Sequence, residues 1–157
     1  MINKQHRKAF SMITAIFVIM IMSIVSIMIM NVTEKTLKST THQYQKEQAA
    51  LLARSYTELA ILYVMYYDRS SDCLETITDH FGDATSGYDI DVRIKYIGNA
   101  NLLAHCSASS IVATLDQNIT GFYSTISLVV DTYIHYKDFD DPSHRDSTFH
   151  RRTLQKL

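Results

Sequence analysis

The side chains that could carry out chemistry in this chain are few, and their spacing fits no catalytic or metal-binding pattern. The 157 residues include two cysteines and seven histidines. No two histidines stand at the i, i+4 spacing of a helical zinc site, and no cysteine and histidine form a tight ligand pattern. The chain also lacks the P-loop, the Gly-rich dinucleotide fingerprint and the G-x-S-x-G and H-E-x-x-H motifs. We therefore predict that the protein is not an enzyme and holds neither a metal ion nor a cofactor.

Length and charge narrow the class of protein further. A chain of 157 residues allows one domain of ordinary size. The 15 Lys and Arg residues nearly balance the 16 Asp and Glu residues, which argues against a general binder of polyanions. With 4 Gly and 1 Pro, the chain is neither disordered by composition nor collagen-like.

One segment near the N-terminus is apolar enough to cross a membrane. Residues 9–30 contain no charge, no Pro and no Gly. As a helix this segment would be about 33 Å long at about 1.5 Å per residue, and a hydrocarbon core is about 30 Å thick. A buried core helix is the alternative, but the rest of so short a chain has too little apolar surface to surround it. We expect the segment to span a membrane.

The charges beside this segment predict its orientation. Lys4, Arg7 and Lys8 precede it, and positive charge is retained on the cytoplasmic side. The N-terminus should therefore stay in the cytoplasm, with a single pass through the inner membrane and the remainder in the periplasm. The apolar run is longer than that of a secretory signal peptide and ends without a small-residue A-x-A site, so we expect the mature protein to keep it.

The start of the apolar segment carries a short motif. Residues 7–13 read Arg-Lys-Ala-Phe-Ser-Met-Ile, which resembles the prepilin processing site of type IV pilins and type II secretion pseudopilins. In that family a basic leader ends in a small residue, usually Gly, followed by Phe, a Ser or Thr and an apolar run. The resemblance implies that a prepilin peptidase removes residues 1–9 by cutting between Ala9 and Phe10, and that Phe10 is then N-methylated. It also implies assembly with other pilin or pseudopilin subunits.

Two positions depart from the family pattern. Ala9 replaces the usual Gly, which keeps a small residue before the cut. Thr14 stands where the family usually carries Glu, whose carboxylate is read as pairing with the N-terminal amine of a neighbouring subunit. A neutral Thr cannot form that ion pair, so Thr14 favours a minor or tip-located subunit. The alternative is an ordinary single-pass anchor whose basic-to-apolar boundary imitates the motif.

The helix is expected to continue past the membrane. Residues 31–67 contain neither Gly nor Pro, and their apolar residues recur at spacings of about 3, 4 and 7. We expect one helix from near Phe10 to near Tyr67, with a membrane-spanning half at 10–30 and an amphipathic half at 31–67. A periplasmic coiled coil is the alternative, but the heptads are irregular. The face expected to pack on a globular head consists of Leu37, Tyr44, Leu51, Leu52, Tyr56, Leu59, Leu62, Tyr63 and Tyr66, with Gln45 and the charged residues on the other faces.

Residues 68–157 are expected to form a small head rich in β-structure. The segment Tyr88–Tyr96 alternates strictly between apolar and charged residues, which predicts a strand with one buried face. Asp89 and Asp91 then lie on its solvated face rather than in a catalytic pair, and Asp140 with Asp141 falls in an acidic turn. Residues 68–83 are expected to form polar turns, residues 102–106 and 111–115 weaker strands, residues 122–136 a strand and residues 148–154 a short last strand. A long N-terminal helix packed on a small antiparallel sheet gives an α+β architecture, which matches the pilin-like fold.

The two cysteines fit a disulfide in that head. Cys73 and Cys106 would lie outside the cytoplasm, where disulfides form. A bond between them would close a loop of about 33 residues and contribute roughly 3 to 4 kcal/mol in the loop-entropy model. Two free thiols are the alternative.

The C-terminal end is the most basic stretch of the chain. Arg145, Arg151, Arg152 and Lys156 could contact the phosphates of nucleic acid, but charges on an edge strand more often prevent aggregation. The favoured function is a structural subunit of a type IV pilus or type II secretion filament. An anchored periplasmic binding or scaffolding module and a DNA-uptake pilin are the alternatives.

Overall fold

The computed structural model describes residues 5–85, 87–115, 125–138 and 145–157, with side chains from Met12 onward. In chain order its elements are helix α1 (Gln5–Tyr66) and strands β1 (Thr76–Phe81), β2 (Tyr88–Asn99), β3 (Ile111–Leu115), β4 (Ile126–Lys137) and β5 (Asp146–Lys156). The chain divides into two compact units, one ending at His42 and the other beginning at Gln43. The second part of α1 therefore belongs with the sheet, and the helix ends within one residue of the predicted position.

The first unit contains the apolar part of α1. Its side chains from Met12 to Met30 are exposed, and the helix is long and apolar enough to cross a membrane. Two hydroxyl groups in this stretch are satisfied by the helix backbone. Ser23 donates to the carbonyl of Ile19 at 2.9 Å, and Ser26 donates to that of Met22 at 2.8 Å. Because these donors are already paired, both serines can enter hydrocarbon without an unsatisfied polar group.

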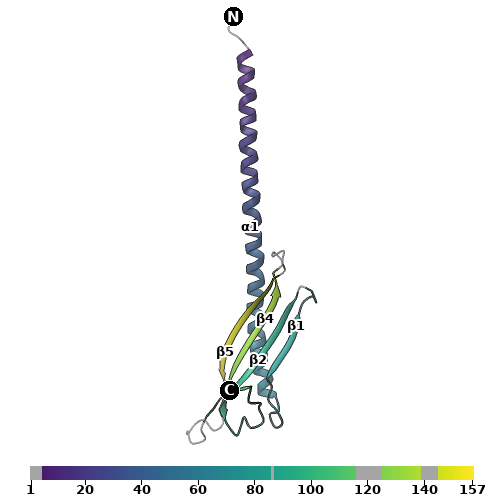
Figure 1. Cartoon of the computed structure of the whole chain (residues 1–157), viewed down its shortest axis with the longest axis vertical. Helices are drawn as coiled ribbons and strands as arrows, with labels where there is room; N and C mark the ends of the chain where they lie inside the picture. Colours follow the sequence, from purple (N-terminus) through teal and green to yellow (C-terminus); the bar gives the residue numbers. More distant parts are fainter. Residues whose placement is uncertain (1–4, 86, 116–124, 139–144) are drawn as a thin grey trace. The chain divides into compact units, whose positions relative to one another are not determined.

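The second unit contains a five-stranded sheet. Its main path is β1-β2-β4-β5, in which each strand is antiparallel to its neighbour (Figure 1). Strand β3 pairs in parallel with the last residues of β2, on the same side of β2 as β1. The predicted α+β class is confirmed, with one parallel pair added to the expected antiparallel sheet.

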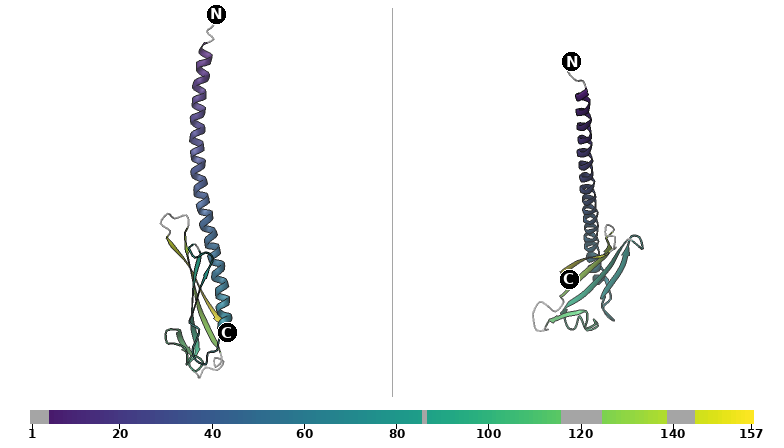
Figure 2. Two further views of the ribbon diagram at one scale, coloured as in Figure 1. Left: turned by 90° about the vertical axis from the view of Figure 1, so that its right-hand side faces the viewer. Right: turned by 45° about the horizontal axis from the view of Figure 1, so that its top comes forward.

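Residues 43–66 of α1 lie along one face of the sheet (Figure 2). Most of the side chains that this part of the helix buries are short. Thr57 is buried, donates to the carbonyl of Ala53 at 2.6 Å and lies 3.1 Å from the hydroxyl of Thr132 on β4. Two residues after the start of this unit, the Gln45 amide donates to the carbonyl of Lys137 at 3.2 Å. The buried stripe consists of Gln45, Ala49, Ala53, Thr57, Ala60 and Val64, at spacings of three and four residues.

The face of the helix that meets the sheet differs from the predicted one. Leu51, Leu62 and Tyr66 are expected to pack on the head, yet they are 57%, 48% and 83% exposed. Leu52, Tyr56 and Leu59 are half-buried at the margins of the contact. A close approach between a helix and a sheet leaves room only for short side chains, so alanines occupy the contact and the large residues are turned away.

The predictions for two segments of the head are wrong. Residues 76–81, expected to form polar turns, pair with β2 as strand β1, with Ile77 opposite Val92. Residues 102–106, expected to form a strand, make turns in which the N–H groups of Leu102 and Leu103 both donate to the carbonyl of Asn99, at 3.0 and 3.2 Å. Leu103 is buried, so its apolar character reflects an anchored loop rather than a strand.

The other strands are confirmed. Strand β2 buries Ile90, Val92, Ile94 and Tyr96 on one face, as its alternation predicts. Strand β4 likewise buries the predicted face, and β5 extends the predicted last strand by two residues at each end. The predicted strand residues 122–124 and the turn at Asp140–Asp141 lie outside the described residues.

Candidate functional site

The candidate processing site lies within α1. The backbone of Ala9 and Phe10 is helical, and the side chain of Thr14 is exposed. Residues 1–4 of the predicted leader lie outside the described residues. Cleavage between Ala9 and Phe10 therefore stays a prediction, carried by the sequence motif.

A second candidate surface is the outward face of α1 in the second unit. Leu51, Leu62, Met65 and Tyr66 are large apolar side chains that remain exposed there. The stripe that packs on the sheet lies on the opposite side of the helix, so the strands that the structure describes leave these side chains uncovered. Exposed apolar surface of this kind marks an interaction surface more often than isolated exposed side chains do.

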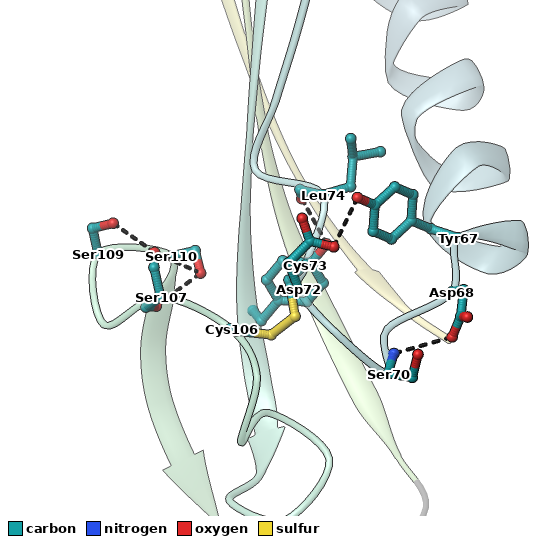
Figure 3. The surroundings of a disulfide bond; sticks show 11 residues. Tyr67, Asp68, Ser70, Asp72, Cys73, Leu74, Cys106, Ser107, Ser109 and Ser110 are labelled. Atoms are coloured by element: carbon teal, nitrogen blue, oxygen red, sulfur yellow. Dashed lines mark hydrogen bonds between the residues drawn. A yellow bond between two sulfur atoms is a disulfide. The ribbon is translucent and has the colours of Figure 1, made fainter.

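The disulfide predicted between Cys73 and Cys106 is present (Figure 3). Its Cα atoms are 4.9 Å apart, and it joins the segment before β1 to the turn after β2. Beside it, the Tyr96 hydroxyl donates to the carbonyl of Leu74 at 2.7 Å. Burial raises the pKa of Tyr96 to about 12, so this donor stays protonated. The Cys73–Cys106 disulfide therefore fixes how the chain after α1 leads into the sheet.

Hydroxyl and carboxyl groups complete this corner of the head. Tyr67 donates to Asp72 at 2.9 Å, which raises the pKa of the phenol, and the N–H of Ser70 donates to Asp68 at 3.0 Å (Figure 3). Earlier in the chain, within α1, the Tyr56 hydroxyl donates to Asp79 of β1. This bond raises the pKa of Tyr56 to about 12. These contacts position the helix end and β1 and bring together no nucleophile with a base.

The face of the sheet away from the helix carries a charged network that the sequence analysis did not find. Arg152 on β5 donates two hydrogen bonds to Asp131 on β4, at 2.7 and 2.9 Å, and His150 lies 2.9 Å from the same carboxylate. The Asp131 side chain is only 4% exposed. The Arg152 hydrogen bonds, with a further contribution from His150, hold the pKa of Asp131 below its ordinary value. Tyr133 stacks on His150 at 4.4 Å and also lies 5.1 Å below the Arg93 guanidinium.

The four basic residues singled out in the sequence do not form one surface. Arg151 and Arg152 are consecutive strand residues, so their side chains lie on opposite faces of the sheet. Arg152 is neutralised by Asp131. Arg145 and Lys156 are at opposite ends of β5. This arrangement lacks the continuous basic stripe that a phosphate backbone needs.

Two hollows lie on the outer face of the sheet. A groove of about 440 Å³ is lined by apolar residues of β2, β3, β4 and β5 together with Lys95, Asp131 and Arg152. A smaller pocket of about 70 Å³ includes His80, Asp89 and His135. Among the described residues there is no group of three or more His, Cys, Asp or Glu side chains that could hold a metal ion.

Searches of protein-family profiles, of curated proteins and of solved structures find no match to this chain. The candidate function therefore depends on the residues and geometry described above.

Proposed function

We propose that this chain is a minor pilin-like subunit, anchored in the inner membrane by residues 10–30 and assembled with other pilin or pseudopilin subunits of a type IV pilus or type II secretion filament. A prepilin peptidase cuts between Ala9 and Phe10, and Phe10 is N-methylated. The protein acts by assembly rather than by catalysis.

The observation that carries the proposal is the continuity of α1 and the exposure of its apolar side chains. The helix runs without a break from the apolar segment to Tyr66. Short side chains meet the sheet, which leaves Leu51, Leu62 and Met65 facing outward. A helix that presents apolar residues both in the membrane-spanning segment and beyond it suits packing against other helices, because each contact removes apolar surface from water or lipid.

Neighbouring subunits are favoured over nucleic acid as partners. The basic residues of β5 are divided between the two faces of the sheet, and Arg152 is bound to Asp131. A DNA-uptake role needs several cations on one face, free to neutralise phosphates. We therefore rank a DNA-binding pilin below a structural subunit.

The decisive test is the N-terminus of the mature protein. The full chain is expressed in two otherwise identical bacterial strains, one with an active prepilin peptidase and one without it, and its mass is measured intact. We expect loss of residues 1–9 and addition of one methyl group to Phe10 only where the peptidase is present.

Two variants sharpen this test. Ala9→Gly restores the small residue that the family usually carries and should be processed at least as completely. Ala9→Leu places a large side chain at the cut and should leave the leader attached. An intact Met1 end in the strain with active peptidase, with Ala9→Gly also unprocessed, would contradict the proposal.

Thr14 supports a second candidate, a single-pass anchored scaffolding module. Its hydroxyl cannot replace the carboxylate that the family uses during assembly. This alternative predicts that the chain keeps its leader and remains in the inner membrane, whereas the first predicts processing and recovery in filament fractions. Thr14→Glu should increase incorporation into filaments if the chain is a pilin-like subunit and should change nothing if it is an anchor.

A further inference from the structure

Strand β5 is one edge of the sheet, and its outward backbone groups can be identified from the ladder. The N–H of Leu157 donates to the carbonyl of Ile126 at 2.9 Å. In an antiparallel ladder every second residue bonds to the partner strand, and the residues between them point away. The backbone N–H and carbonyl groups of Thr148, His150, Arg152 and Leu154 therefore point away from β4. In the described part of the chain, no hydrogen bond engages their N–H or carbonyl groups.

Strand β1 is the opposite edge. The N–H of Ile94 donates to the carbonyl of Glu75 at 2.7 Å, so the same alternation turns the backbone groups of Thr76, Thr78 and His80 away from β2. The N–H of His80 is taken by the Asp79 carboxylate at 2.8 Å. The backbone groups of Thr76 and Thr78 have no partner among the described residues. Each of the two edge strands therefore has free backbone groups that can pair with another strand.

The two edges have opposite charge. From Asp68 to Asp83, the segment that contains β1 has five carboxylates and one Arg, a formal charge of −4. From Arg145 to Lys156, the segment that contains β5 has four Lys or Arg residues and one Asp. Because Asp131 neutralises Arg152, three of these cations and the one Asp count toward the edge, a formal charge of +2. A contact between two β5 edges or two β1 edges brings like charges together, whereas a β1 edge meeting a β5 edge brings opposite charges together.

Strand direction also favours the unlike contact. Three successive antiparallel pairings make β1 and β5 antiparallel to each other. When a second copy in the same orientation is placed beside the first, its β5 meets the first copy's β1 as an antiparallel pair. Copies joined in this way share one orientation, as copies inserted in one membrane must.

We propose that the heads of this protein bind one another head-to-tail, with β5 of one copy adding to β1 of the next through main-chain hydrogen bonds and opposite charge. The contact is heterologous, so repeated addition extends a row of heads rather than closing a symmetric dimer. Since β1 is short, each junction is weak in solution. Anchoring in a membrane raises the effective concentration of neighbouring heads.

Two proline substitutions block the two edges separately. Leu154→Pro removes an outward N–H from β5, and Thr78→Pro removes one from β1. Neither N–H takes part in the ladder within the sheet, and proline is tolerated at such edge positions. The matched controls Leu154→Thr and Thr78→Val change the same side chains but keep both N–H groups.

The association state of the full, unprocessed chain is measured in detergent micelles by sedimentation. We expect the wild-type chain and both controls to form species larger than a dimer at low salt and to lose them at high salt, because screening weakens the charge attraction. Each proline variant alone should remain monomeric. An equal mixture of the two should form dimers and nothing larger, since only one compatible pair of edges remains.

Several outcomes would overturn the inference. Either proline variant alone associating like the wild-type chain would show that another surface joins the copies. The Thr78→Pro variant alone forming dimers would show a symmetric β5–β5 contact. A mixture that stays monomeric while both variants keep the Cys73–Cys106 disulfide and the wild-type circular dichroism would show that the edges do not pair.

A cross-linking experiment keeps the inference testable if a proline variant fails to fold. Chains carrying Thr78→Cys are mixed with chains carrying either Thr148→Cys or Leu154→Cys and are oxidised in the same micelles. With equal amounts of the two chains, random collision gives a mixed yield equal to the sum of the two yields between identical chains, and we expect mixed cross-links to exceed that sum. A mixed yield equal to or below that sum would contradict the proposal. The assay uses no peptidase, so its result does not depend on leader processing.

Discussion

Arg152 and Asp131 face each other across β5 and β4, joined by two hydrogen bonds of 2.7 and 2.9 Å. Asp131 is almost completely covered although it lies on the side of the sheet that the helix does not reach. A covered carboxylate costs free energy unless a cation and hydrogen-bond donors accompany it. Arg152 is therefore a structural partner of Asp131 rather than a cation available to an external anion.

The first prediction concerns loss of this partner. Arg152→Ala removes two charge-assisted hydrogen bonds, while His150 still contacts the carboxylate. We expect the free energy of unfolding to fall, because the buried Asp131 carboxylate loses both of these donors. Lys156→Ala, a charge removed on the same face of β5, should change it by less than about 0.5 kcal/mol. Denaturant unfolding in detergent, followed by tyrosine near-ultraviolet circular dichroism, measures both, and equal effects would contradict the assigned role.

The second prediction concerns pH. Arg152 keeps the pKa of folded Asp131 below the ordinary value of about 3.9 that the unfolded chain has. The stabilisation is thus fully present above about pH 4 and is lost as the pH falls through the lowered pKa of the folded state. We expect wild-type stability to decline in that acid range more steeply than that of Asp131→Asn. Parallel profiles for the two proteins would show that the carboxylate is not linked to folding.

The third prediction tests which face of α1 meets the sheet. Ala53→Leu forces a large side chain into a fully buried contact and should lower the free energy of unfolding by about 1–3 kcal/mol. Leu51→Ala, two positions away on the exposed face, should leave it within about 0.5 kcal/mol. If the large residues packed on the head, the order of these effects would be reversed. Thermal unfolding of the unprocessed chain distinguishes the two cases.

The fourth prediction concerns the disulfide. Replacing both Cys73 and Cys106 by Ser should lower the free energy of unfolding by roughly 3 to 4 kcal/mol, since the bond spans 33 residues. Hydrogen exchange should rise first in the turns at residues 100–110, which lose their tether to the segment before β1. Unchanged exchange in those turns would indicate that buried Leu103 alone holds them.

Sequence periodicity predicted an element correctly where that element has one face in the core and the other in solvent. The alternation from Tyr88 to Tyr96 identified β2 because its two faces meet core and solvent. In α1 we expected the largest apolar side chains to pack on the head. The contact with the sheet instead buries short residues such as Ala49 and Ala53 and leaves Leu51 exposed. Nothing local in residues 76–81 requires a strand; β1 forms because β2 offers an edge to pair with.

The features that local sequence patterns did not predict depend on pairing between strands. The contact of Asp131 with Arg152 depends on the register of β4 and β5, which no pattern within either strand specifies. The parallel pairing of β3 depends on how the turns after Asn99 return the chain to β2. The cysteine pair could be predicted because the periplasmic location expected for the head favours oxidation and the chain has no other cysteine.

The disulfide also determines how the head responds to tension. Cys73 and Cys106 make the chain between them a closed covalent ring that contains β1 and β2. When the chain is pulled from α1 and from its C-terminal end, force crosses the sulfur bridge and bypasses this ring. The chain between the two cysteines, which are 33 residues apart, then cannot extend under the force. The bridge thereby removes roughly 110 Å of possible extension, at about 3.3 Å per residue. The pulling force therefore acts on the contact of α1 with the sheet and on the pairing of β4 with β5, and the hairpin of β1 and β2 remains covalently closed until the bridge is reduced.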